Sequence, residues 1–506
     1  MTGWVEKAAP GVSSAKLKLS LGTAIALFLV FHCWRGVWFL VRQWPLWLAG
    51  GLTLVAVQVY DGLGAYGLSA AGAGVAAALV VWALLHRRSF EVCVYWPLRG
   101  WVRGLFVYAP GWDELMAVCG LAKKVRSEHR APRLIRTRST NTVDRVRVKT
   151  LRGQTLADFA DNTDRFRENT GAEDCRVRRL YWPGLTIAGR QLIRRRLRAR
   201  VLDLWFLVRD PLANPVPLFA VDDRPNLKKL TLALREDGLP WALRLLGTHV
   251  LVAGRTGAGK GSVLWSLIRS LGPAIRDGSV ELWMVDPKGG MEFAAGQALC
   301  ARYCYGDRST DDEGKKRAYQ LDFAEFLEDA VDTMQHRQRE LRGISRTHKA
   351  RPGDPHIVIM IDELACLTAY VTDREAKKRI DVALGMLLSQ GRAVGISVVA
   401  ALQDARKEVL PDRGLFPTRI ALGLNEPDET DLVLGSVARK NGARCDEISE
   451  DTPGVAFVAV EDTREPIRVR FAYVDDDEIG RLTQTHRHQP MPVDPYPAEP
   501  LEETNR

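Results

Sequence analysis

The sequence predicts an α/β fold: a parallel sheet wrapped by helices, preceded by a small α/β domain and an N-terminal transmembrane helical hairpin. Three observations support this prediction. Apolar strands alternate with amphipathic helices over 242–474, strands of alternating polarity lie in 145–208, and 46–85 is almost uncharged. The predicted divisions are a cytoplasmic or interfacial segment (1–43), the hairpin (44–88), an Arg-rich linker and small α/β domain (89–241), the large domain (242–474) and a disordered, Pro-rich tail (475–506).

Length and composition set the broad class of the chain. Its 506 residues leave room for about three domains. A hydrophobic content of 46% is typical of a folded protein. The formal charge of +10 favours an anionic partner, either a phosphate backbone or lipid headgroups. The eight cysteines include no CxxC pair and no Cys/His spacing suited to zinc, which fits a reducing cytosol.

The hairpin is predicted from the distribution of charge. Asp61 is the only ionisable group in 46–85, and the segment is interrupted by DGLGAYG at 61–67. Because roughly 20 apolar residues cross a bilayer as a helix, we expect two spans, about 44–60 and 64–85. Basic residues flank the hairpin: Lys16, Lys18, Arg35 and Arg42 precede it, and His86, Arg87 and Arg88 follow it. The positive-inside rule therefore predicts a multi-pass protein of the cell membrane whose large domain lies in the cytoplasm.

A further apolar stretch, 19–41, lies before the hairpin. An interfacial helix is favoured over a third span, because an odd number of spans would place the two basic flanks on opposite sides of the membrane.

The small domain is predicted from residues 145–208. The run 145–150 (RVRVKT) alternates like a half-buried strand, 155–170 has helical spacing, and 201–208 has the composition of another strand. The basic run 190–200 (RQLIRRRLRAR) is either a DNA-facing surface or a solvated face, and both interpretations stay open.

A phosphate-binding loop follows the predicted strand 248–253 (THVLVA) and precedes a predicted helix at 262–271. Its glycines allow backbone N–H groups to converge on phosphate oxygens, and Lys260 can neutralise the β- and γ-phosphates. The predicted nucleotide-binding residues are Gly254, Arg255, Thr256, Gly257, Ala258, Gly259, Lys260, Gly261 and Ser262.

Gly261 departs from the usual pattern of this loop. The residue after the lysine is normally Ser or Thr, whose hydroxyl binds Mg²⁺. Either Ser262 takes over as the metal ligand or water bridges the ion to the loop. Nucleotide binding is less affected by this change than metal binding and turnover.

Further polar residues are predicted at the carboxyl ends of strands, where parallel sheets gather functional groups. The apolar strand 356–363 (HIVIMIDE) ends in Asp362, a candidate Mg²⁺ ligand, and Glu363, a candidate base for the attacking water. The strand 281–288 (ELWMVDPK) contains Asp286. The strand 395–403 ends in Gln403, either a γ-phosphate sensor or a satisfied loop amide.

These motifs together resemble the FtsK/SpoIIIE family, and more closely its conjugative Tra branch from high-GC Gram-positive bacteria. The resemblance covers about 145–474. It implies a RecA-like P-loop ATPase domain that uses ATP and Mg²⁺ and forms a homo-hexameric ring around double-stranded DNA, with ATP between subunits. On the family pattern, Arg392 in GRAVG would be the finger that reaches the neighbouring subunit's γ-phosphate, with Arg419 as the second candidate.

The resemblance implies a membrane-anchored, ATP-driven DNA translocase for conjugative transfer of a plasmid or an integrated element, working with accessory transfer proteins. Sequence-reading modules of the winged-helix type, common at the end of family members, do not fit in the few residues after 474. One alternative is an ATPase for protein secretion, although such chains usually contain several phosphate loops. The other is a coupling protein that binds nucleotide with weak turnover because of Gly261.

Overall fold

The computed structural model describes residues 44–125, 128–182, 185–187, 190–193, 196–306, 318–405, 413–460 and 465–489. The chain divides into two compact units, Met1–Tyr95 and Trp96–Arg506. Each unit is considered separately below.

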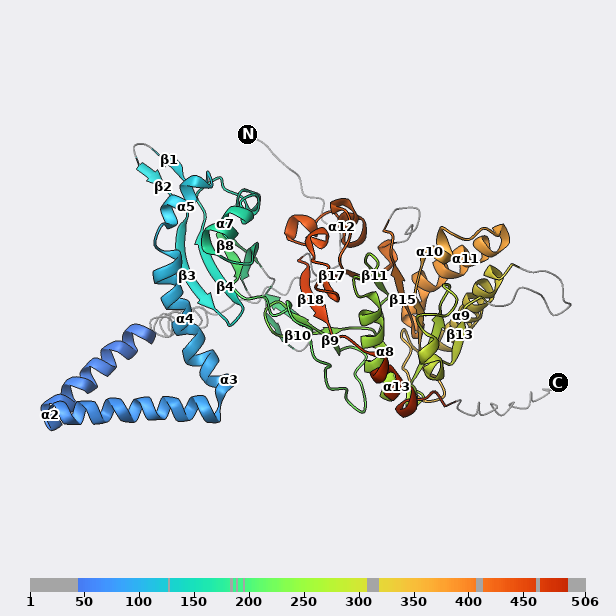
Figure 1. Cartoon of the computed structure of the whole chain (residues 1–506), viewed down its shortest axis with the longest axis horizontal. Coiled ribbons are helices and arrows are strands. Elements are labelled where there is room, and N and C mark those ends of the chain that lie inside the picture. The colour runs from blue at the N-terminus through green and yellow to red at the C-terminus, as the bar shows by residue number, and fades with distance from the viewer. Residues whose placement is uncertain are drawn as a thin grey trace, which may run out of the picture. The chain divides into compact units, whose positions relative to one another are not determined.

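The first unit is dominated by helix α2 (Trp44–Leu85), which is interrupted at Gly64. The φ and ψ of Gly64 are 66° and −166°, so the chain turns sharply inside the predicted turn at 61–67, as Figure 1 shows. Helix α3 (Arg87–Phe90) and a π-helical turn, Glu91–Tyr95, follow. Among the described residues, no helix combines the length and the apolar character of a membrane span. The two spans stay a prediction, and the predicted interfacial helix at 19–41 lies outside the described residues.

The small domain is built on an antiparallel four-stranded sheet of order β3-β4-β8-β5. Its strands are β3 (Arg133–Ser139), β4 (Val143–Lys149), β5 (Asp174–Trp182) and β8 (Arg196–Leu207). Its helices are α4 (Trp96–Arg103), a π-helical turn at Gly104–Tyr108, α5 (Trp112–Val118), α6 (Leu156–Ala160) and α7 (Thr163–Thr170). Two further strand pairs are β1 (Lys123–Val125) with β2 (Glu128–Arg130) and β6 (Leu185–Ile187) with β7 (Arg190–Ile193). The two predicted strands are confirmed, and the single helix predicted at 155–170 is two short helices. The DNA-facing surface predicted at 190–200 stays a prediction, because most of its side chains lie outside the described residues.

The large domain is built on a ten-stranded mixed sheet of order β10-β9-β18-β17-β16-β11-β15-β14-β12-β13. Strands β16, β11, β15, β14, β12 and β13 are parallel, whereas β17, β18, β9 and β10 continue the sheet with antiparallel pairings. The bounds are β9 (Leu230–Arg235), β10 (Pro240–Leu243), β11 (Val250–Ala253), β12 (Val280–Val285), β13 (Arg302–Cys304), β14 (His356–Ile361), β15 (Ile396–Leu402), β16 (Thr418–Ala421), β17 (Val455–Val460) and β18 (Ile467–Phe471). The prediction of a parallel sheet starting at 242 was therefore wrong in two respects. Part of the sheet is antiparallel, and the sheet begins before residue 242. Short connections such as the turn between β9 and β10 force antiparallel pairing, and these two strands extend the domain toward the N-terminus.

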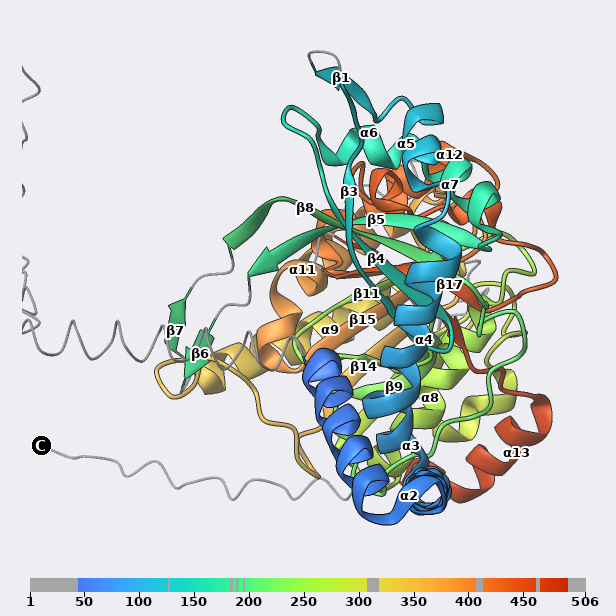
Figure 2. The same cartoon turned by 90° about the vertical axis from the view of Figure 1, so that its left-hand side faces the viewer.

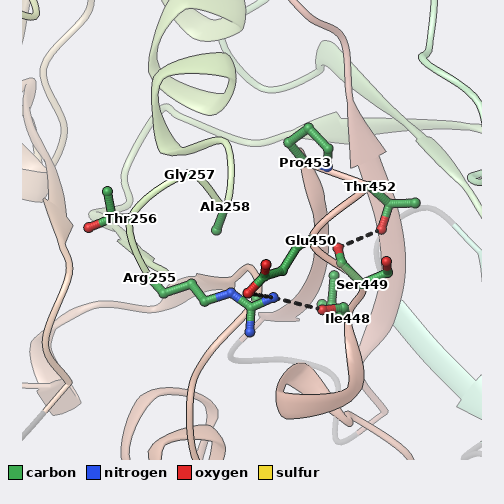
Figure 3. Close-up of a pocket in the computed structure, with 10 residues that line it drawn as sticks. Arg255, Thr256, Gly257, Ala258, Ile448, Ser449, Glu450, Thr452 and Pro453 are labelled. Atoms are coloured by element: carbon green, nitrogen blue, oxygen red, sulfur yellow. Dashed lines mark hydrogen bonds and ion pairs between the residues drawn. The ribbon is translucent and has the colours of Figure 1, made fainter.

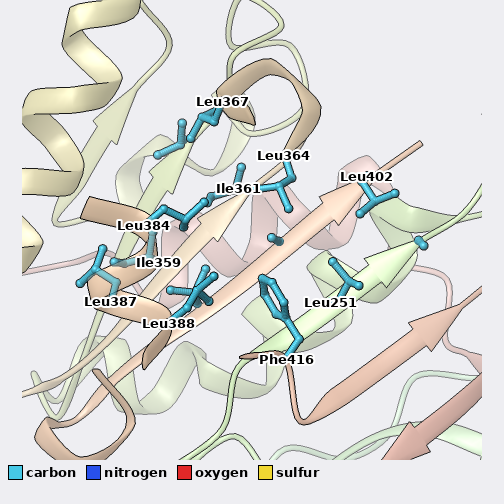
Figure 4. Packing of buried hydrophobic residues seen from close by; sticks show 14 of the residues in the cluster. Leu251, Ile359, Ile361, Leu364, Leu367, Leu384, Leu387, Leu388, Leu402 and Phe416 are labelled. Atoms are coloured by element: carbon cyan, nitrogen blue, oxygen red, sulfur yellow. The ribbon is translucent and has the colours of Figure 1, made fainter. Parts of the chain in front are cut away.

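Helices cover both faces of this sheet (Figure 2). Helices α9 (Gln320–Leu341), α10 (Ala365–Thr368) and α11 (Arg374–Gln390) pack on one face, and α8 (Lys260–Arg276) and α13 (Asp476–Thr485) on the other. Alternate residues of each strand enter different cores. Ile359 and Ile361 of β14 face Leu384 and Leu387 of α11, as Figure 4 shows, whereas Met360 joins the core under α8. The remaining elements are α12 (Pro427–Leu434) and 3₁₀ turns at Ala294–Leu299, Gly391–Val394, Arg413–Leu415, Arg439–Asn441 and Cys445–Glu447.

The predicted disordered tail, 475–506, is wrong in its first part. Helix α13 begins after Asp475, whose side chain accepts a hydrogen bond from the Glu478 N–H at 2.8 Å. Ile479 and Leu482 are buried, and Glu478 pairs with Arg269 of α8 at 2.7 Å. The apolar spacing within this short segment is enough to dock one helix on the sheet. Residues 490–506 lie outside the described residues.

Buried ion pairs join the small domain to the large one. Glu236, directly after β9, lies 2.7 Å from Arg176 and 3.2 Å from Arg178, both on β5. The side chains of Glu236 and Arg176 are 9% and 7% exposed. Burial would lower the pKa of Arg176, but the charges of Glu236 and Asp174 outweigh it and raise that pKa. The pairing therefore stabilises the charged forms where water is largely excluded.

Glu236→Gln is expected to lower the free energy of unfolding by about 2 kcal/mol, because the buried Arg176 would lose its ion pair with Glu236. Urea denaturation followed by tryptophan fluorescence would measure the change. Glu168→Gln, at an exposed position on α7, is the matched control and should cost less than about 0.5 kcal/mol. Equal stability of the two variants would contradict a structural role for this ion pair.

Candidate nucleotide-binding site

The candidate site lies along one edge of the large sheet, where four parallel strands end in register. Ala253 of β11 pairs with Leu402 of β15, and Ile361 of β14 pairs with Ala400 of β15 and with Val285 of β12. The residues of β11, β14 and β15 are fully buried, and this burial fixes where the carboxyl end of each strand reaches the edge of the sheet. The residues that follow these four ends are consequently neighbours, as the sequence predicted.

The predicted phosphate loop forms the turn between β11 and α8. Gly257 and Gly259 have φ of 79° and 97°, a conformation that side-chain-bearing residues rarely adopt. Space is also restricted at Gly259, because a Cβ there would lie 2.4 Å from the backbone nitrogen of Gly454. The loop therefore depends on glycine for both its shape and its packing, and it delivers Lys260 at the first position of α8.

Lys260 is folded back on the loop and is 9% exposed. Its ammonium group donates to the carbonyl oxygens of Gly254 at 2.8 Å and Arg255 at 3.2 Å. Burial lowers the pKa of Lys260, and the neighbouring positive charge of Lys288 lowers it further, whereas the Glu363 carboxylate opposes both. An anion that enters the loop would meet an ammonium group that is already desolvated.

The two acids after β14 are brought together with a lysine that the sequence analysis did not select. Lys288 lies 3.1 Å from Asp362 and 3.2 Å from Glu363. Both carboxylates are nearly buried, with side chains 8% and 5% exposed. Burial would lower the pKa of Lys288, but the two acids outweigh that effect and raise it. Lys288 could have been selected from the sequence, because it lies at the end of a predicted strand, directly after Asp286 and Pro287.

Gln403 connects the loop to the acids. Its side-chain oxygen accepts a hydrogen bond from the Thr256 hydroxyl at 3.1 Å, and its backbone N–H donates to Glu363 at 3.3 Å. The same Glu363 oxygen also accepts from the Ala365 N–H at 3.4 Å. Gln403 therefore contacts both the phosphate loop and the candidate base, and its role as a sensor of the nucleotide stays a prediction.

Asp286 organises the loop that follows β12 and does not face the phosphate loop itself. It is fully buried, and its carboxylate accepts backbone N–H groups of Glu292 at 2.9 Å, Phe293 at 3.0 Å and Lys288 at 3.4 Å. A carboxylate with several N–H donors is strongly stabilised in its charged form. Asp286 therefore fixes the positions of Lys288 and Glu292 relative to the sheet.

Asp286→Asn is expected to lower the free energy of unfolding by about 1.5–3 kcal/mol, because the amide replaces one charged acceptor by a donor that faces buried N–H groups. Chemical denaturation would measure the loss. Asp277→Asn, at the exposed end of α8, keeps one oxygen that can accept the Ser279 N–H and should cost no more than about 1 kcal/mol. A similar loss for both variants would contradict the organising role of Asp286.

The two candidate arginine fingers lie elsewhere. Arg392 is exposed in the 3₁₀ turn before β15, so it lies at the amino end of a strand whose carboxyl end carries Gln403. Seven residues at ~3.3 Å each separate the two edges of the sheet by roughly 20 Å, beyond the reach of an arginine side chain. Arg392 is thus excluded from the site of its own chain. Arg419 lies within β16, where it pairs with Leu251 of β11 and Ala459 of β17.

A cavity of about 180 Å³ opens on the other side of the phosphate loop (Figure 3). Residues 255–258 line one wall, and the other is lined by Ile448, Ser449, Glu450, Thr452 and Pro453. Arg255 crosses between them, donating to the carbonyl oxygens of Leu424 at 3.2 Å and Ile448 at 3.1 Å. A ligand whose phosphates lie in the loop would have room for its remaining atoms here.

Residues 228–347, which include the phosphate loop and the Asp286–Glu292 segment, match the model of the FtsK/SpoIIIE family. This segment is therefore similar to the FtsK/SpoIIIE ATPases. The matched segment contains the phosphate loop and Lys260, whereas the paired acids Asp362 and Glu363 lie beyond it.

Individual relatives extend the match beyond this domain. Transfer protein TraSA of Streptomyces ambofaciens is 27% identical over 406 residues, which cover 76% of this chain and 88% of TraSA. DNA translocase FtsK 2 of Ralstonia nicotianae is 27% identical over 291 residues, covering 53% of this chain but only 36% of that protein. A solved structure of the pCW3 conjugation coupling protein TcpA with ATPγS has a TM-score of 0.44 and 16% identity, and the match covers 74% of this chain and 98% of that one.

The donor set of the site suits a magnesium ion that arrives with a nucleotide. Asp362 and Glu292 offer carboxylate oxygens, the type of ligand that Mg²⁺ prefers. Among the described residues, no group of three or more His, Cys, Asp or Glu side chains is arranged to hold a metal ion. Since Mg²⁺ is usually bound by one or two carboxylates together with substrate phosphates, the site fits a metal that needs ATP to complete its coordination.

Proposed function

We propose that this chain is a membrane-anchored, ATP-driven translocase of double-stranded DNA that serves conjugative transfer of a plasmid or an integrated element. The observation that supports it most strongly is the match to a transfer protein along most of both chains, 76% of this one and 88% of TraSA. The FtsK translocases match over a smaller part of their own length. These matches support a function for the ATPase domain more than a function for the whole protein.

In the proposed mechanism each residue of the site has a different role in binding or hydrolysing ATP. Backbone N–H groups of the loop and the ammonium group of Lys260 bind the β- and γ-phosphates. Asp362 is the candidate ligand of Mg²⁺, which when bound neutralises charge that develops on the phosphates. Glu363 accepts a proton from the attacking water, and Gln403 positions its backbone N–H against that carboxylate. Lys288 has to release the two acids before they can act.

The ring is proposed as a homo-hexamer around the duplex. Arg392 is exposed and lies at the opposite edge of the sheet from the phosphate loop of its own chain. This placement supports the proposal that Arg392 completes the site of the next subunit. Contacts of the ring with the DNA backbone would not depend on the base sequence, and they would weaken as the salt concentration rises.

The membrane anchor is proposed to be the hairpin formed by α2. Large apolar side chains on its second arm are exposed: Val75, Leu79, Val80, Val81, Leu84 and Leu85. A contiguous apolar surface of this kind marks a membrane or protein contact. Anchoring would place the ATPase domain in the cytoplasm, next to the membrane that DNA must cross.

ATP hydrolysis by the full-length protein in lipid nanodiscs, with and without duplex DNA, tests the proposal. We expect duplex DNA to stimulate hydrolysis at low salt and the stimulation to fall as salt rises. Lys260→Ala is the background control. Hydrolysis that ignores duplex DNA but responds to a protein substrate would replace the proposal by protein secretion, and ATP binding without turnover would replace it by a coupling role.

A further inference from the structure

Gly261 has a specific neighbour in the folded protein, the side chain of Glu292. A Cβ built on Gly261 would lie 2.7 Å from Oε1 of Glu292 and 3.6 Å from its Cδ. The first distance is too short for an added side chain unless the carboxylate moves, so the carboxylate occupies the space in which the Ser or Thr of an ordinary phosphate loop would project. The residue that the loop lacks is thus replaced in space by an acid from another segment.

Glu292 is held in that place by the rest of the fold. Its backbone N–H donates to the buried carboxylate of Asp286 at 2.9 Å, and the next residue, Phe293, donates to the same oxygen at 3.0 Å. The Phe293 ring packs edge-on against Trp265 of α8, with centroids 6.1 Å apart. Both sides of the contact are therefore fixed, because α8 begins with Lys260 and Gly261.

Two other carboxylates act electrostatically on Glu292. Burial raises the pKa of Glu292, and the negative charges of Asp362 and Asp286 raise it further, against Lys288 and a hydrogen bond with Trp265 that lower it. The charge of Asp362 therefore acts on Glu292. A divalent cation between them would remove their mutual repulsion.

We propose that the Glu292 carboxylate replaces the hydroxyl that is missing after Lys260. With Asp362, it is a protein ligand of the Mg²⁺ bound to ATP. The proposal rests on the ATP-binding part of the proposed function. A carboxylate is a stronger ligand for Mg²⁺ than a neutral hydroxyl, so Gly261 and Glu292 form a matched pair and the loop is not defective. Ser262 is one residue further along α8, about 100° around the helix from Gly261, and is not needed in this arrangement.

The test measures the Mg²⁺ concentration that the full-length protein needs for tight binding of a fluorescent, non-hydrolysable ATP analogue. Glu292→Gln keeps the shape and removes the charge, and we expect it to raise the required Mg²⁺ concentration about ten-fold or more. Affinity for the analogue without Mg²⁺ should not fall. Ser262→Ala should leave the Mg²⁺ requirement unchanged, whatever its effect on nucleotide affinity.

A double substitution separates a metal-binding role from a structural one. Glu292→Ala should weaken Mg²⁺ binding, Gly261→Ser alone should displace the Glu292 carboxylate from the 2.7 Å contact, and the two together should recover Mg²⁺ binding through the new hydroxyl. Mn²⁺ in place of Mg²⁺, followed by electron paramagnetic resonance, gives a second readout that does not depend on turnover.

An unchanged Mg²⁺ requirement in Glu292→Gln, or a shift in Ser262→Ala instead, would overturn the proposal in favour of Ser262 or water. A wild-type protein that binds no nucleotide with or without Mg²⁺ would instead contradict the proposed function itself.

Discussion

Glu363→Gln is expected to reduce ATP turnover by about 10²–10⁴-fold while ATP still binds, because the amide keeps the size of the side chain but cannot accept a proton from water. Glu363 is nearly buried, and one of its oxygens accepts N–H groups from Gln403 and Ala365. These contacts hold the carboxylate in one orientation. Phosphate release by the full-length protein with duplex DNA measures turnover, and a fluorescent ATP analogue measures binding.

Asp381→Asn is a matched control for this experiment, since Asp381 is an exposed carboxylate on α11, away from the strand ends. Its turnover should equal that of the wild type. Turnover that is equally low in wild type and Glu363→Gln would refute catalysis by this carboxylate and would favour the coupling protein with weak turnover.

Lys260→Ala is expected to reduce turnover by at least about 10²–10³-fold and also to weaken ATP binding, which distinguishes it from Glu363→Gln. The ammonium group is 9% exposed and its two carbonyl partners belong to the loop, so no other described side chain donates to these oxygens in its place. Removing it leaves the phosphates without their nearest buried cation. Titration of the ATP analogue against both variants would separate the two effects.

The exposed Lys229, directly before β9, provides the control. Lys229→Ala should bind the analogue and hydrolyse ATP like the wild type, and Lys260→Ala should unfold at a similar temperature if its effect is local. Tight ATP binding by a folded Lys260→Ala protein would show that the phosphates do not contact this loop.

Much of the ATPase domain could be predicted from the sequence because its signals are local. A buried parallel strand appears as a continuous apolar run, so the strands that end at Ala253, Ile361 and Leu402 were located with small errors at their ends. The phosphate loop is contiguous, and its glycines carry their own conformational signature. Placing Asp362, Glu363 and Gln403 beside it needed only the rule that parallel strands end at one edge.

The errors concern contacts between segments that are distant in the sequence. Strand β9 lies before the predicted domain boundary and pairs with β18, more than 200 residues later, so no local pattern assigned it to the large sheet. Helix α13 was assigned to a disordered tail because its flanks are acidic and Pro-rich, although two buried side chains, Ile479 and Leu482, dock it on the sheet. Tertiary burial outweighs composition in both cases.

The sequence by itself therefore determined the chemistry of the site: a phosphate loop, a lysine, two acids and a glutamine at the ends of parallel strands. It also determined that Gly261 lacks a hydroxyl. Only the tertiary structure decided what faces that glycine, because Glu292 is brought to it by the buried hydrogen bonds of Asp286 and the packing of Phe293 on α8. Such a contact joins two segments through the core, and no spacing along the chain encodes it.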